Sequence, residues 1–157
     1  MKETVYVETT IFSFYHERRS SPAVVAMRDW TRQWWDDHRH AYEVVTSAAV
    51  LAELDTGSLP QRDDALAMAL GLPAIPVEDE VEEIVEVYIK HEVMPKEPLG
   101  DALHLALASL HKVDYLLTWN CRHLANANKF AHIRRINSLM GLHVPAIVTP
   151  LELLGGY

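Results

Sequence analysis

Strand-like and helix-like stretches alternate along the whole chain. Runs of mostly β-branched, aliphatic and aromatic residues predict five short strands, at residues 4–7, 43–46, 74–77, 115–118 and 146–149. Between them, apolar residues recur at helical spacing, which predicts helices that start after Ser21 and Ser47 and further helices over residues 63–70, 81–89, 101–111 and 129–140. Pro76 places the third strand at an edge of the sheet. The alternation is typical of an α/β protein with a mainly parallel sheet covered on both faces.

The composition predicts a single domain over residues 1–157. Hydrophobic residues make up 49% and charged residues 23% of the chain, as in ordinary soluble globular proteins. Cys121 is the only cysteine, so a disulfide framework is excluded and a thiolate metal site is disfavoured. No apolar run approaches the roughly 18 residues that a membrane span needs. We therefore expect a cytoplasmic protein with no membrane partner.

The charge pattern is mixed. A formal net charge of −8 argues against a dedicated nucleic-acid binder, which usually carries a basic face. However, basic residues gather in one stretch near the C-terminus, where Arg122, Lys129, Arg134 and Arg135 are candidates for phosphate contacts. The ordinary alternative is that this stretch is the solvated face of a helix.

Two apolar segments begin or end in polar side chains. In GDALHLALA, Asp101 opens a predicted helix, and in LLTWNCRHL a predicted strand ends just before Asn120. A helix of about 11 residues and a strand of about five residues both span roughly 16 Å. If the strand returns antiparallel to the helix, Asp101 and Asn120 become neighbours.

The same edge of the sheet collects two more acids. Glu8 follows the first strand, and Glu53 lies in the second turn of the helix after the second strand. Parallel sheets place ligand sites outside the carboxyl ends of their strands. Three convergent carboxylates repel one another unless a cation lies between them, and such oxygen-rich sites suit Mg²⁺ or Mn²⁺. The reaction class that follows is metal-assisted phosphodiester hydrolysis.

The order of these motifs resembles the PIN domain family, especially VapC-type toxins and their solitary relatives. The stretches that carry the resemblance are YVETT, VLAEL, GDALHLALA, LLTWN and, at the end, IVTPLELL. It implies a three-layer α/β/α sandwich and a metal-dependent ribonuclease. By the family pattern, Glu8, Glu53 and Asp101 bind metal. Asn120 stands where a fourth carboxylate is common, and Thr10 and Thr118 match the supporting hydroxyl positions.

Two departures from the family pattern affect the expected chemistry. Glu8 is one methylene longer than the usual Asp, and Asn120 is neutral, so the number of metal ions is left open between one and two. Asn120 is expected to ligate metal through its carbonyl oxygen or to orient a water. The resemblance also implies an RNA substrate, an antitoxin partner and a homodimer.

Other readings of the same residues stay open. Asp101 alone could simply favour the start of its helix electrostatically. His104 lies one turn after Asp101 and is expected to support the site from the core rather than to touch phosphate. The rival function is a catalytically weak PIN scaffold that binds RNA or protein. A phosphatase is less favoured because the sequence shows neither a nucleophile nor a glycine-rich phosphate loop.

Overall fold

Five parallel strands form the centre of the molecule in a computed structural model that describes residues 1–155. They are β1 (Thr4–Val7), β2 (Glu43–Ser47), β3 (Ala74–Ile75), β4 (Tyr115–Leu117) and β5 (Ala146–Val148). Their order in the sheet is β3-β2-β1-β4-β5, and every neighbouring pair is parallel. All five predicted strands are therefore present, and β3 lies at an edge, as Pro76 indicated.

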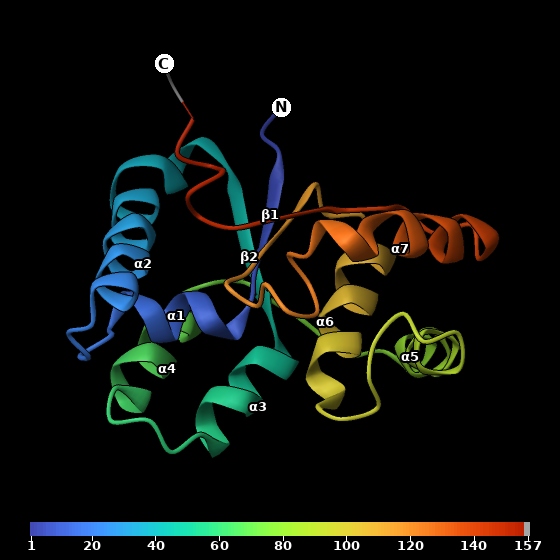
Figure 1. The fold of residues 1–157 in the computed structure, drawn as a ribbon, viewed down its shortest axis with the longest axis horizontal. Coiled ribbons are helices and arrows are strands. Elements are labelled where there is room, and N and C mark those ends of the chain that lie inside the picture. Colours follow the sequence, from blue (N-terminus) through green and yellow to red (C-terminus); the bar gives the residue numbers. More distant parts are fainter. Residues whose placement is uncertain (156–157) are drawn as a thin grey trace.

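Helices cover both sides of this sheet. They are α1 (Thr9–Tyr15), α2 (Pro22–Gln33), α3 (Ala48–Thr56), α4 (Arg62–Leu70), α5 (Asp79–Lys90), α6 (Leu99–Leu110) and α7 (Ala127–Leu139). Figure 1 shows α1, α2 and α4 on one side of the strands and α5, α6 and α7 on the other. The fold is thus the expected three-layer α/β/α sandwich. Within residues 1–155, no helix is both long and apolar enough to cross a membrane.

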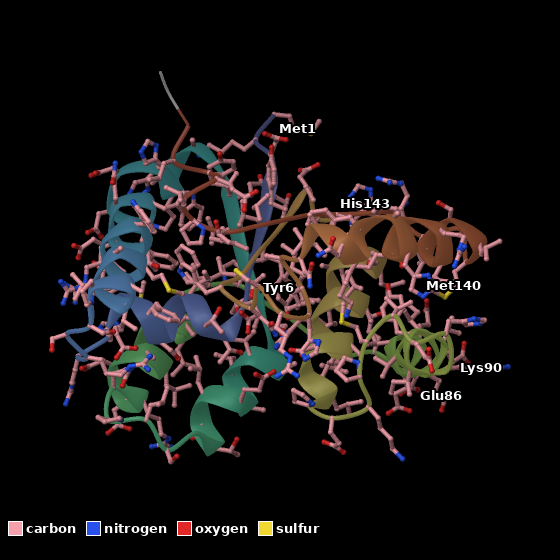
Figure 2. All side chains as sticks on the ribbon, viewed as in Figure 1. Met1, Tyr6, Glu86, Lys90, Met140 and His143 are labelled. Carbon is pink, nitrogen blue, oxygen red and sulfur yellow. The ribbon has the colours of Figure 1, made fainter. Side chains whose placement is uncertain are left out.

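The central strand forms the middle of the core. Val5, Tyr6 and Val7 are fully buried, and the facing helix α6 buries most of its length, including Leu105 and Leu107. Figure 2 shows side chains filling the space between the layers, with Tyr6 near the middle. The chain runs from β1 through β2 to β3 at one edge and then crosses to β4 on the other side of β1, so the strand order switches side between β1 and β4. Sheets of this kind bind ligands at such a point.

Two helical segments form against the local preference of their residues. Helix α1 follows β1 directly, although the β-branched run through Thr9, Thr10 and Ile11 favours a strand. Glu8 overrides that preference, since its side chain accepts a hydrogen bond from the Thr10 amide and caps the helix. The polar run 36–40 favours an end to α2. Instead the chain continues as a π-helical turn, Trp34–His38, because both tryptophans at its start are buried.

Candidate metal centre

Glu8 is a buried carboxylate, and one of its oxygens accepts three hydrogen bonds. Its Oε1 atom accepts hydrogen bonds from the hydroxyls of Thr10, at 2.5 Å, and Thr118, at 2.6 Å, and from the Thr10 amide, at 3.2 Å. Only 4% of the residue is exposed. Thr10 and Thr118 therefore hold the carboxylate of Glu8 with their hydroxyl groups. The three donors fix the carboxylate at the end of β1 and leave its second oxygen for another partner.

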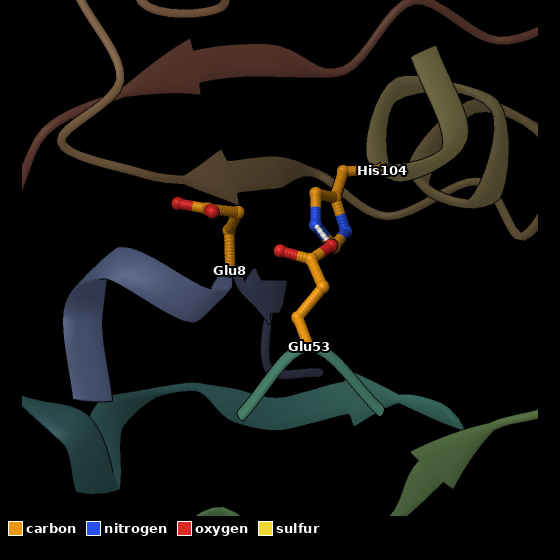
Figure 3. A group of neighbouring side chains, drawn as sticks. All are labelled: Glu8, Glu53 and His104. Atoms are coloured by element: carbon orange, nitrogen blue, oxygen red, sulfur yellow. Dashed lines mark ion pairs between the residues drawn. The ribbon is translucent and has the colours of Figure 1, made fainter. Parts of the chain in front are cut away.

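Glu53 reaches the same place from α3. Its Oε2 atom accepts a hydrogen bond from the Thr9 hydroxyl at 3.0 Å, and its Oε1 atom lies 2.5 Å from Nε2 of His104. Figure 3 shows Glu8, Glu53 and His104 side by side, each from a different element. The ligand atoms that these residues offer lie within 4.8 Å of one another.

Gly100 makes the approach of Glu53 to α6 possible. A Cβ atom at this position would lie 2.9 Å from Oε1 of Glu53, which is closer than such atoms approach. The carboxylate therefore packs against the bare backbone at the start of α6. Sequence reasoning did not single out this glycine, although it opens the motif GDALHLALA.

Asp101 and Asn120 are neighbours, as the matched lengths of helix and strand predicted. The Nδ2 group of Asn120 donates to Oδ1 of Asp101 at 2.8 Å. The amide orientation follows from His123, whose backbone N–H faces Oδ1 of Asn120 at 3.0 Å and so requires an oxygen there. Asn120 is thus anchored by His123 at its Oδ1 end and holds Asp101 with its Nδ2 end.

The electrostatics of the centre couple three acids to one histidine. Burial raises the pKa of Glu8 and that of Asp101, and nearby histidine charge only partly opposes this. Burial acts on Glu53 too, but contact with His104 and the Thr9 hydroxyl outweigh it, and the Glu53 pKa is lowered. Burial alone would lower the pKa of His104, but the effect of the surrounding carboxylates, Glu53 first, outweighs it and the pKa is raised. Positive charge is therefore favoured among these acids.

The residues present fit a divalent cation. Oδ2 of Asp101 is buried and lacks a hydrogen-bond partner among the described residues, whereas Oε1 of Glu53 contacts Nε2 of His104. A buried carboxylate oxygen without a donor is costly, and a cation would remove that cost. The donor set of carboxylate oxygens with an imidazole nitrogen belongs to known divalent metal chemistry. Glu8 and Glu53 would hold the ion with carboxylate oxygens of the compact group. Asp101 lies outside that group but interacts electrostatically with Glu53, and it would add its unpartnered Oδ2.

The predicted phosphate-binding residues are not all at this centre. Lys129 is close enough that its charge lowers the pKa of Asp101, and it lines a surface cavity of about 430 Å³ with Lys96 and His123. Sequence reasoning did not assign roles to Lys96 and His123, because loop residues from different parts of the chain meet only in the fold. Arg122 is exposed just after Asn120.

The other two arginines project from α7 into different surroundings. Arg134 borders an apolar groove beside β5, and Arg135 hydrogen-bonds His132 at 3.0 Å. Both are exposed. The basic stretch is therefore divided between the cavity beside Asp101 and the outer surface of the helix.

Comparisons with known proteins agree with this geometry. Residues 5–129 match the family model of the PIN domain. A structure of FitAB bound to an IR36 DNA fragment is similar over 98% of this chain and 99% of that chain, with a TM-score of 0.56 and 16% identity. The crystal structure of FitAcB from Neisseria gonorrhoeae covers 95% and 99%, with a TM-score of 0.55 and 18% identity. No curated protein sequence matches the chain.

Proposed function

The chain belongs to the PIN domain family, and on that basis we propose that it is a ribonuclease that uses Mg²⁺ or Mn²⁺ to hydrolyse phosphodiester bonds. The observation that carries the proposal is that Glu8, Glu53 and His104 bring ligand atoms within 4.8 Å of one another at the carboxyl end of the sheet, with the buried Oδ2 of Asp101 left without a hydrogen-bond partner among residues 1–155. A bound cation would supply an activated water and stabilise charge on the phosphoryl group.

Three polar residues would position the acids of such a site. Thr10 and Thr118 hold Glu8 so that one oxygen faces the centre. Asn120 is a positioning residue, because it binds Oδ1 of Asp101 and leaves Oδ2 available. Its neutral amide also keeps a fourth negative charge away from Asp101, which favours a single cation over two.

The substrate would approach over the cavity beside Asp101. It is lined by Lys96, His123 and Lys129, by the apolar residues Ile89, Met94 and Pro95, and by one acid, Glu92. Cations there would offset the repulsion between RNA phosphates and an acidic chain. Arg122 would extend this surface, whereas Arg134 and Arg135 would contribute only to a longer RNA path over α7.

A protein partner is part of the proposal. The family contains toxins that act with an antitoxin, and the FitAB structure includes a DNA fragment. We propose that this chain acts as the toxin of such a pair and that it forms a homodimer. Co-expression with the product of a small neighbouring open reading frame, followed by size-exclusion chromatography, tests this. Separate elution of the two chains would contradict it.

The catalytic assignment is tested with Asp101→Asn, which keeps the size of the side chain but removes its charge. Single-stranded RNA is incubated with the protein and Mn²⁺, and the products are separated on a gel. We expect cleavage by the unaltered chain, loss of cleavage in the variant, and unchanged cleavage in the control Asp37→Asn, an exposed acid on the π-helical turn. Equal cleavage by Asp101→Asn would refute the assignment. A pure binding scaffold would neither cleave RNA nor bind Mn²⁺.

A further inference from the structure

His104 is fixed from within the core by a chain of hydroxyl groups. Only 1% of the residue is exposed, and its Nδ1 atom lies 2.8 Å from the Tyr6 hydroxyl. That hydroxyl in turn lies 2.6 Å from Oγ of Ser47, which caps α3. A hydroxyl can donate or accept, so Tyr6 satisfies Nδ1 in either tautomer of the imidazole. The ring orientation is therefore set without any contribution from its other nitrogen.

The other nitrogen, Nε2, points into the acidic centre. It lies 2.5 Å from Oε1 of Glu53, at ion-pair distance. Both atoms are buried, and within residues 1–155 neither has a hydrogen-bond partner besides this contact. A histidine whose remote nitrogen is held by a polar group and whose near nitrogen faces carboxylate oxygens has the arrangement typical of a metal ligand.

The two neighbouring acids are arranged in the same way. Glu8 has three donors on Oε1, and Glu53 has Thr9 on Oε2. In each carboxylate one oxygen is thus held by hydroxyl or amide donors, and in Glu53 the other oxygen faces Nε2 of His104. Together with Nε2 of His104, these residues offer a compact set of one nitrogen and two carboxylate donors.

We propose that His104 is a direct ligand of the cation and that its nitrogen makes the centre select Mn²⁺ over Mg²⁺. This rests on the proposed function as a cation-dependent ribonuclease and adds a residue to its metal site. Mg²⁺ prefers oxygen ligands, whereas an imidazole nitrogen favours first-row transition cations. The structure thus departs from a site built of carboxylates alone.

The test reads the ligand atoms directly. Mn²⁺ is bound to the protein labelled with ¹⁵N-histidine or with histidine of natural abundance, and electron spin-echo envelope modulation is recorded. We expect modulation from a coordinated nitrogen that changes with the isotope. His104→Gln removes this signal and weakens the Mn²⁺ Kd by at least about tenfold while Mg²⁺ binding changes little. The control His123→Gln, which alters the histidine nearest Asp101 on the cavity side, keeps the signal.

The outcomes separate this proposal from the one on which it rests. Bound Mn²⁺ with oxygen ligands only would overturn the role of His104 and leave the ribonuclease standing. No binding of either cation would overturn both. The labelled, unaltered protein decides the question even if His104→Gln fails to fold. Tyr6→Phe adds a second check, since it should weaken Mn²⁺ binding by about tenfold and retain the nitrogen signal.

Discussion

Replacing Gly100 by alanine should separate the stability of the protein from its affinity for metal. The new Cβ would lie 2.9 Å from Oε1 of Glu53, whereas ordinary contacts begin at 3.4 Å. The carboxylate is the flexible end of a side chain, so it would retreat by about 0.5 Å rather than distort the backbone. A shift of about that size is the limit within which functional groups must be held. We therefore expect the Mn²⁺ Kd to weaken by about 10- to 100-fold, as for other disturbances of residues that orient metal ligands.

Stability should change in the opposite direction or not at all. Gly100 has an ordinary helical position in α6, where alanine is favoured over glycine by about 0.5–1 kcal/mol. Isothermal titration with Mn²⁺ and urea unfolding of the metal-free protein measure the two effects. Gly71→Ala, at the end of α4, is the matched control and should leave Mn²⁺ affinity unchanged. If Gly100→Ala bound Mn²⁺ as tightly as the unaltered chain, Glu53 would not be a ligand in the position seen here.

Two further predictions concern the rest of the fold. Tyr88→Phe removes the hydroxyl that donates to the buried Oδ1 of Asn137 at 2.6 Å. The free energy of unfolding measured in urea should therefore fall by about 1–3 kcal/mol, while the Mn²⁺ affinity stays unchanged. An unchanged free energy of unfolding would contradict this. Hydrogen bonding to Arg19 lowers the Glu17 pKa from 4.5 to about 2, so the folded state gains stability above pH 4.5 and loses it as pH falls toward 2. The unaltered chain should therefore unfold at a higher temperature than Glu17→Gln at neutral pH, and the gap should close in acid; a gap independent of pH would exclude Glu17 as its source.

The sequence was most informative where local pattern and chain geometry determine position. Asp101 and Asn120 could be paired because a helix and the strand after it have similar lengths and run in opposite directions. Glu8 could be placed because acids that follow central parallel strands meet at one edge of the sheet. The order of the strands, with β1 between β2 and β4, is what brings all these positions together.

Contacts between distant residues could not be predicted in the same way. The bond between Tyr6 and His104 joins residues 98 positions apart, and it depends on how α6 lies against β1. The same holds for Lys96, which reaches the cavity beside Asp101 from a loop. Helix α1 was missed because its first residues favour a strand locally, while the cap supplied by Glu8 decides the outcome.

The central claim is that the acids at the end of the sheet form a cation site. Crystals grown with Mn²⁺ and measured at the manganese absorption edge test this most directly, because the anomalous difference map locates the ion without reference to activity. We predict one strong peak in contact with Glu8, Glu53, Asp101 and His104. A map with no peak there, or with its strongest peak elsewhere on the molecule, would contradict the account.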